Sequence, residues 1–190
     1  FYNADNGALI SQWNGIYTTS DGGDSWTQAS TNYLGGQDLA YADATTLFAA
    51  GGEQKIYKSI DGGTTWTFSY QGPNGPNPDL WYNLGVYFYD SENGIVTSEE
   101  GQTFMTSDGG DSWTLSTIAG QYGLMNGAWM LDVNTIYVCA TPGEVFVTTN
   151  GGTAWTSDSP QDFEPSYYKI KFTSNGTGFV CGSGATGGTI

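Results

Sequence analysis

Residues Thr106-Ser-Asp-Gly-Gly-Asp-Ser-Trp113 are one of four near-copies of a short phrase that recurs along this chain of 190 residues. The other copies occupy residues 19–26, 59–66 and 148–155. Their final tryptophans are 40, 47 and 42 residues apart. Repeats of about 40–45 residues are typical of β-propellers, in which each repeat forms one blade of four strands. The spacing of the phrase therefore predicts a propeller.

Each copy has the composition of a tight hairpin turn between two strands. The glycine pair can adopt positive φ without steric penalty, and the aspartate can accept hydrogen bonds from its own turn. The tryptophan supplies a large apolar surface suited to a place between packed sheets. We therefore predict structural roles for one Asp or Asn and one Trp in each copy: Asp21, Trp26, Asp61, Trp66, Asp108, Trp113, Asn150 and Trp155.

Calcium binding by these aspartates is the alternative interpretation. In the fourth copy Asn150 replaces the aspartate and Ala154 replaces a hydroxyl residue, yet the turn pattern persists. Persistence without the carboxylate favours the structural role, and no metal site is predicted.

The rest of each repeat indicates short strands and no helix. Apolar residues alternate or form short runs, such as residues 86–90 and 93–97, bounded by Gly, Asn, Asp and Pro. The predicted fold class is all-β, a β-propeller with four-stranded antiparallel blades. Asp90 and Asp132 recur at the end of a first strand and are expected to cap turns, while Trp13 and Trp129 are expected in the core.

The phrase Ser/Thr-x-Asp-x-Gly-x-Thr/Ser-Trp resembles the Asp-box, or bacterial neuraminidase repeat. The fuller repeat, from Phe-x-Asp-x-x-Asn-Gly through Asp-Gly-Gly-x-x-Trp, is similar to that of the photosystem II assembly and stability factors. Similar blades occur in sortilin-type receptors, xyloglucanases and many secreted bacterial proteins. The resemblance covers essentially the whole chain and implies that ligands bind at the mouth opposite the Asp-box tips. It implies no single function, because enzymes, receptors and scaffolds share the repeat.

We predict one propeller segment over residues 1–190. A propeller closes its ring to hide sheet edges, and the first and last repeats read as incomplete. We therefore expect part of a larger ring of about seven blades, completed by the remainder of the same polypeptide. A self-contained five-bladed ring is the alternative. The predicted repeats are residues 1–30, 36–70, 83–117 and 124–158 and an incomplete fifth at 167–190.

Composition excludes several classes of partner and reaction. The chain has 4 Lys and Arg against 19 Asp and Glu, a net charge of −15, and no histidine. Nucleic-acid binding needs cations that neutralise phosphates, so no nucleic-acid partner is predicted. No long apolar stretch is present, so no membrane insertion is predicted.

All four basic residues are lysines, so arginine is absent as well. Without histidine there is no Ser-His-Asp triad and no histidine metal site. Without arginine there is no bidentate clamp for carboxylates. The Asp-box resemblance links sialidase activity to an arginine cluster, so that activity is excluded here. No catalytic residue and no cofactor is predicted.

Two features are candidates for binding. The longest connection between repeats ends in Trp81 and Tyr82, which are predicted to stack on a sugar ring or a partner's side chain. Coverage of the inter-blade core is the alternative for both. Glu99 and Glu100 on a turn are the second candidate, with solvated turn charges as the alternative.

A glycosidase would need two carboxylates roughly 5–10 Å apart. Adjacent residues on an extended chain point to opposite sides, so Glu99 and Glu100 do not form an obvious pair. Asp79, Asp38 or Glu144 would have to supply the partner.

Cys139 and Cys181 occupy equivalent places in successive repeats, and we predict buried free thiols there. A disulfide between them is the alternative.

We predict a non-catalytic propeller module, secreted or at the cell surface and of bacterial type, that binds a protein or glycan partner. The low content of charged residues, 12%, favours the extracellular setting. One alternative is part of a glycoside hydrolase of the xyloglucanase kind. Another is an assembly factor for a membrane protein complex, which would be expected to use a basic patch.

Overall fold

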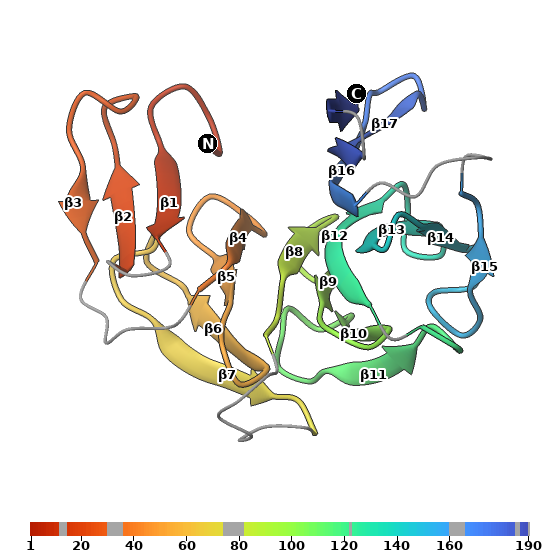
Figure 1. Ribbon diagram of the computed structural model, residues 1–190. Coiled ribbons are helices and arrows are strands. Elements are labelled where there is room, and N and C mark those ends of the chain that lie inside the picture. The colour runs from red at the N-terminus through yellow and green to blue at the C-terminus, as the bar shows by residue number, and fades with distance from the viewer. Residues whose placement is uncertain are drawn as a thin grey trace.

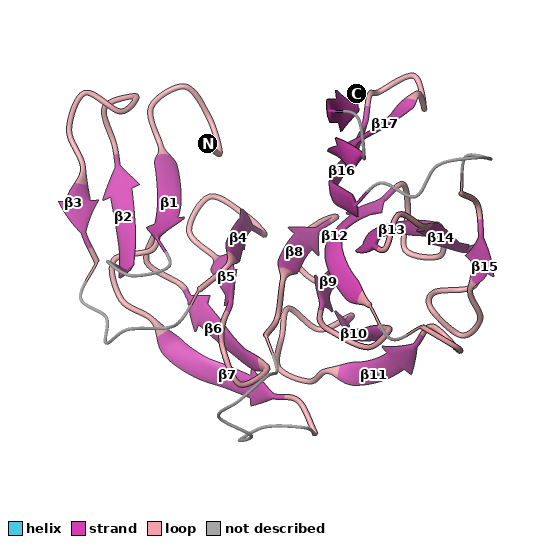
Figure 2. Cartoon of the chain, viewed as in Figure 1, coloured by secondary structure: helices cyan, strands magenta, loops and turns pink. Residues whose placement is uncertain are grey.

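The computed structural model describes residues 1–11, 15–29, 36–73, 82–121, 123–159, 166–184 and 187–189. Over these residues the chain forms strands and turns and no helix (Figure 2). No segment of the described chain is therefore a helix able to cross a membrane. Trp13, Asp79 and Trp81 lie outside the described residues.

The strands form five antiparallel sheets, called sheets 1 to 5 in chain order. Sheet 1 contains β1 (Gly7–Ser11), β2 (Gly15–Thr19) and β3 (Thr27–Gln28). Sheet 2 contains β4 (Asp38–Tyr41), β5 (Leu47–Ala50), β6 (Lys55–Ser59) and β7 (Thr67–Gln71). Sheet 3 contains β8 (Gly85–Phe88), β9 (Gly94–Thr97), β10 (Gln102–Thr106) and β11 (Thr114–Thr117). Sheet 4 contains β12 (Leu124–Met130), β13 (Ile136–Thr141), β14 (Val145–Thr148) and β15 (Thr156–Ser157). Sheet 5 contains β16 (Ser166–Phe172), β17 (Gly178–Gly184) and β18 (Gly187–Thr189).

The sheets follow one another around a common axis, as the blades of a propeller do (Figure 1). In sheets 2 to 5 the first strand lies at one edge of the sheet, and β4, β8, β12 and β16 pack side by side. These four are called the inner strands. Sheets 1 and 5 lie on the two sides of an opening in Figure 1, so the five sheets form part of a ring. The predicted fold class is confirmed.

Hydrogen bonds inside each hairpin tip explain the repeated phrase. In the third copy the Thr106 hydroxyl donates to Asp108 Oδ1 (2.8 Å) and accepts from the backbone N–H of Gly110 (2.8 Å). Asp108 accepts in turn from the Ser112 backbone N–H (2.9 Å) and hydroxyl (2.6 Å). Asn150 accepts from the backbone N–H of Ala154 at 2.9 Å, so the amide reproduces the backbone contact without the carboxylate.

Neighbouring sheets pack through large apolar side chains. Phe48 of sheet 2 is fully buried and stacks on Phe88 of sheet 3, with ring centroids 4.2 Å apart. The edge of the Trp113 ring meets Phe48 at 5.9 Å and Phe88 at 6.2 Å. The tryptophan of the third tip therefore closes the contact between two sheets.

A serine on an outer strand fixes the tip of the following sheet. Ser69 donates to the Gly110 carbonyl (2.9 Å) and accepts from Trp113 Nε1 (3.3 Å). Ser116 makes the same two bonds to Gly152 and Trp155, the latter at 2.9 Å. We call this arrangement the serine latch.

The place of the latch serine in the first repeat, three residues after the tip tryptophan, is occupied by Ala29. Trp66 Nε1 of the next tip turns instead to the Gly63 carbonyl, at 2.9 Å. The indole N–H of Trp66 therefore finds its acceptor within its own tip, because the preceding sheet has no latch serine.

The turns after the first strands hold the capping residues that the sequence predicts. Asp90 Oδ1 accepts from the backbone N–H groups of Glu92 (2.8 Å) and Asn93 (2.7 Å). Asp132 Oδ1 accepts in the same way from residues 134 and 135. The predicted capping role is confirmed.

The two cysteines are free, and they differ in exposure. Cys139 is fully buried between sheets 4 and 5, where burial raises the pKa of its thiol to about 12. Cys181 is exposed, so the prediction of a buried thiol is wrong there. The reason is that the face of sheet 5 that carries Cys181 meets no further sheet among the described residues.

Candidate binding site

The inner strands surround a cavity of about 750 Å³ on the propeller axis, called here the axial cavity. Four different sheets contribute side chains to its wall through β4, β8, β12 and β16, and β1 with the first two residues completes it. The side chains that give the cavity its chemical character are Tyr2, Asp38, Tyr41, Tyr87, Trp129, Lys169 and Lys171.

Close approach of the inner strands brings these side chains together. A Cβ atom on Gly85 would lie 3.0 Å from the Asn126 carbonyl oxygen and 3.0 Å from Gly127 Cα. Backbone cannot yield as a flexible side chain can, so β8 and β12 approach this closely only because position 85 has no side chain. Tyr87 and Trp129, two residues further along each strand, then point to the same side.

Aromatic rings lie in pairs on the wall of the axial cavity. Tyr87 and Trp129 lie 4.6 Å apart between ring centroids, and Tyr2 and Tyr41 lie 5.4 Å apart. A second hollow of about 460 Å³ shares Tyr87 and Trp129 and continues to Tyr89. Burial raises the pKa of Tyr87 and of Tyr41, so both phenols remain neutral and able to donate hydrogen bonds at neutral pH.

The charge of the axial cavity differs from that of the chain. Two of the four lysines, Lys169 and Lys171, lie on its wall, although the chain has a net charge of −15. Lys169 Nζ lies 2.6 Å from Asp38 Oδ2 and so joins sheet 5 to sheet 2 across the axis. Lys171 has no ion-pair partner among the residues that the structure describes. One ammonium group is therefore available to an anionic ligand.

This combination can recognise a ligand that carries both an apolar or planar group and a negative charge. Aromatic faces stack on rings, peptide planes and sugar rings, and an ammonium group binds a carboxylate. Asp38 is the one carboxylate among the described residues of the wall, and it is ion-paired. Over the described residues, no group of three or more acidic, cysteine or histidine side chains is placed to hold a metal ion.

Trp129, which the sequence places in the core, is half-buried: it packs against the apolar cluster between sheets 4 and 5 and also lines the axial cavity. The residues that sequence reasoning missed are Tyr87, Lys169 and Lys171. Tyr87, Trp129 and Lys171 occupy the same place in successive first strands, and this shared position is the signal that would have grouped them.

The other predicted binding residues lie at the end of the strands remote from the Asp-box tips. Tyr82 is 40% exposed, and its carbonyl accepts a hydrogen bond from the Ser98 hydroxyl at 2.9 Å. Glu99 pairs with Leu124 in a single β-bridge, and Glu100 adopts a positive φ of 52° and is exposed. Trp81 lies outside the described residues.

The structure brings Tyr82 and Glu99 together. Partial burial raises the pKa of Glu99, the charge of Glu100 adds to this, and a hydrogen bond from the backbone of Tyr82 opposes it. Asp38, considered as a catalytic partner for Glu99, pairs with Lys169 instead. None of Tyr82, Glu99 and Glu100 lines the axial cavity, and their binding role stays a prediction.

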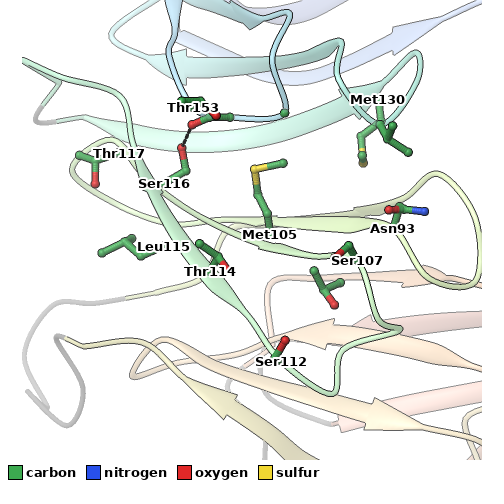
Figure 3. Close-up of a pocket in the computed structure, with 14 residues that line it drawn as sticks. Asn93, Met105, Ser107, Ser112, Thr114, Leu115, Ser116, Thr117, Met130 and Thr153 are labelled. Carbon is green, nitrogen blue, oxygen red and sulfur yellow. Dashed lines mark hydrogen bonds between the residues drawn. The ribbon is translucent and has the colours of Figure 1, made fainter.

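A groove of about 620 Å³ lies between sheets 3 and 4 on the side of the Asp-box tips (Figure 3). Serine, threonine and methionine side chains line it, with Met105 pointing into the space between the sheets. The equivalent place between sheets 2 and 3 holds Lys58, whose Nζ donates to the Gly109 carbonyl at 2.6 Å. Replacement of a hydrogen-bonding lysine by methionine leaves the groove uncharged.

Comparison with known proteins identifies the repeat. Residues 114–187 match the sequence model of the family described as photosynthesis system II assembly factor YCF48. The resemblance to Asp-box repeat propellers is confirmed. The matched residues include β11 to β17 and therefore two inner strands of the axial cavity. A search of curated proteins finds no significant match to the chain.

Solved propellers share the arrangement of the sheets. An ancestral GH74 enzyme superposes with a TM-score of 0.77 at 17% identity over 97% of this chain. YCF48 from Cyanidioschyzon merolae gives 0.71 at 16% identity over 96%, and YCF48 bound to D1 peptide gives 0.70 at 16% over 96%. The chain spans 26% of the enzyme and 64% and 58% of the two YCF48 chains. At these identities the likeness establishes the fold alone.

Proposed function

We propose that this chain is a non-catalytic interaction module that binds an extended segment of a partner protein in the axial cavity. The observation that carries the proposal is the convergence of the Tyr87–Trp129 pair and the unpaired ammonium of Lys171 on one wall. The partner segment is expected to carry an apolar or aromatic side chain next to a carboxylate. The solved complex of YCF48 with D1 peptide supports a peptide as the ligand class for this repeat type.

The composition of the wall supports a binding role over hydrolysis. Glycoside hydrolysis requires two carboxyl groups facing the scissile bond. The described wall offers Asp38 alone, and that carboxylate is held in an ion pair with Lys169. We place the module outside the cell because few of its residues are charged, and fractionation of the source cells tests that setting.

Peptide-array screening of the full-length protein, followed by calorimetry with the best acidic aromatic peptide, tests the function. We expect Trp129→Ala and Lys171→Ser each to raise the dissociation constant for that peptide at least 10-fold. The matched controls are Phe68→Ala, an exposed aromatic on an outer strand, and Lys55→Ser, which is paired with Glu53. Both controls are expected to bind as the unaltered protein does.

Three outcomes would overturn the proposal. They are the absence of any bound peptide, peptide binding that is indifferent to Trp129→Ala, and release of reducing ends from xyloglucan. Binding of xyloglucan oligosaccharides in place of peptides, lost in Trp129→Ala, would keep the cavity as the site and reject a protein partner.

A further inference from the structure

The outer edge of sheet 3 is formed by a strand without the usual protection of an exposed edge. β11 is the last strand of this sheet, so only the edge that faces β10 is paired. Soluble proteins commonly protect a free strand edge with charged residues, proline or a β-bulge. β11 reads Thr-Leu-Ser-Thr over residues 114–117 and pairs with β10 without a register shift. It therefore has none of these three protections.

The outer strands of the other complete sheets differ from β11. β3 and β15 contain two residues each, too few to support an added strand. β7 contains five residues, but a β-bulge at Ser69 interrupts its pairing between the partners of Ile56 and Tyr57. Among the described outer strands of sheets 1 to 4, β11 is therefore the longest regular one.

The backbone groups on the free edge of β11 can be assigned from the bonds on its paired edge. The Ile118 N–H donates to the Gly101 carbonyl at 2.8 Å. Inward and outward residues alternate along an antiparallel pair, so Ser116 also faces β10, while Leu115 and Thr117 direct their N–H and C=O groups outward. No hydrogen bond within the described chain reaches these outward groups. They are the groups with which an added strand would pair.

The groove of about 620 Å³ between sheets 3 and 4 runs along this free edge. All four residues of β11 line it, and the tip of sheet 4 at residues 151–153 lies opposite (Figure 3). Its described lining consists of hydroxyl, amide, glycine and apolar residues, with no charged side chain. Leu115 is 42% exposed beside it. The groove thus offers an added strand apolar contacts in addition to backbone partners.

Carboxylates surround this uncharged groove. Glu92, Asp111 and Asp132 are exposed, and each is the sequence neighbour of a lining residue. The whole chain has a net charge of −15. A segment with cationic ends is therefore attracted to the groove, whereas a second copy of this chain is repelled from it.

We infer that β11 is a docking edge for an extended basic segment of a partner protein, which adds to sheet 3 as a further strand. Strand addition of this kind takes its affinity from main-chain hydrogen bonds and its specificity from alternate side chains. The segment carries uncharged β-branched or apolar residues opposite β11 and lysine or arginine at its ends. β11 lies on the outer side of the ring (Figure 1), so the inference does not depend on the proposed function of the axial cavity.

A pair of synthetic peptides titrated into the full-length protein tests the inference. Both alternate valine and threonine, and one ends in lysine pairs where the other ends in glutamate pairs. At low salt the lysine peptide is expected to bind at least 10-fold more tightly. Amide hydrogen exchange of Leu115 and Thr117, followed by NMR, is expected to slow at least 10-fold in the complex. Ser116 is the internal control, because its N–H already faces β10.

Variants and modified peptides separate strand addition from other contacts. Thr117→Pro removes an outward N–H and leaves the bonds to β10, so it is expected to raise the dissociation constant at least 10-fold. Thr117→Val keeps that N–H and is the matched control, with a change below about 2-fold. Trp129→Ala is also expected to leave the dissociation constant unchanged, because the axial cavity is not the site.

Methylation of the peptide backbone gives a test that does not depend on the folding of a variant. N-methyl groups on two adjacent residues block both edges of an extended peptide, whereas two on alternate residues leave one edge free. Only the first peptide is expected to lose binding.

Four results would overturn the inference. They are no binding of the lysine peptide, equal binding of the glutamate peptide, equal effects of the two methylation patterns, and unchanged exchange of Leu115 and Thr117 in the complex. Slow exchange of these two amides in the free protein that disappears on dilution would also overturn it, because a second copy would then occupy the edge.

Discussion

Asp108 accepts three hydrogen bonds within its own tip, from the hydroxyls of Thr106 and Ser112 and from the Ser112 backbone. These bonds favour the ionised carboxylate and, led by the Ser112 hydroxyl, lower its pKa from 3.8 to about 2. A carboxylate whose folded pKa lies below its unfolded pKa stabilises the fold at pH values above the unfolded pKa. That stabilisation is lost as the pH falls from about 4 to about 2.

We predict that Asp108→Asn lowers the urea midpoint at pH 7 and flattens its decline between pH 4 and pH 2. The amide cannot titrate, so the proton-linked part of the decline disappears. Urea unfolding at several pH values measures this. Asp111→Asn is the matched control, since it removes the same charge from the same tip at a side chain that is 81% exposed. If both variants flattened the pH dependence of the urea midpoint equally, Asp108 would not be the carboxyl group responsible for it.

Ser116 illustrates how one hydroxyl joins two sheets. It donates to the Gly152 carbonyl and accepts from Trp155 Nε1 at 2.9 Å. Ser116→Ala is predicted to lower the free energy of unfolding by about 1–3 kcal/mol, because two part-buried polar groups lose their partner. Denaturant unfolding measures it, with Thr117→Ala on the same exposed strand as control. A loss no larger than that of the control would show that water replaces the hydroxyl.

Neighbouring sheets are held together by apolar side chains that project from their strands. Phe48 lies on β5 and touches both Phe88 and Trp113 of the next sheet. Phe48→Ala is predicted to cost about 3–5 kcal/mol of unfolding free energy, as is usual for a buried phenylalanine. Phe68→Ala on β7 is the control, and we expect it to cost less than about 1 kcal/mol. Similar costs for the two variants would contradict the packing role of Phe48.

The tips could be predicted from sequence because their chemistry is local. The side-chain bonds of Thr106 and Asp108 that shape the third tip join residues between 106 and 112, so the phrase itself contains donor, acceptor and turn. The turn caps at Asp90 and Asp132 are local for the same reason. Local contacts need no knowledge of which strands are neighbours in space.

The axial cavity could not be predicted in this way. Its wall takes residues from five different strands, and alternation within one strand does not say which strand is innermost. The sequence places Trp129 in the core, and only the structure shows that it also faces the axial cavity. The contact between Asp38 and Lys169 joins residues 131 apart, and no local pattern contains it.

The charge of the whole molecule sets its response to salt. With a net charge of −15, repulsion among carboxylates opposes the compact state. The cross-axis ion pair is partly exposed, at 51% and 23% for its two side chains, so it contributes about 0–1 kcal/mol. Repulsion is the larger of the two effects.

We therefore predict that Tm rises when sodium chloride is increased from 10 to 300 mM. Screening weakens the repulsion more than it weakens the three ion pairs of the described chain. Differential scanning calorimetry measures the change, and sucrose at matched osmolality controls for effects unrelated to charge. A fall of Tm with salt would mean that the ion pairs dominate.

The residue after the first paired position of the second strand is Phe48 in sheet 2, Ile95 in sheet 3 and Tyr137 in sheet 4, three side chains of different size in repeats that are otherwise alike. Repeats of similar sequence can mispair while the chain folds, because the tip hairpin of one repeat could pack against the wrong sheet. A different side chain at each contact between sheets fits the space left by the correct neighbouring sheet. The same side chain fits the other sheets poorly, which disfavours the wrong pairings. Replacement of Ile95 and Tyr137 by phenylalanine would make the three contacts between sheets alike, and such a chain would refold into a mixture of blade orders.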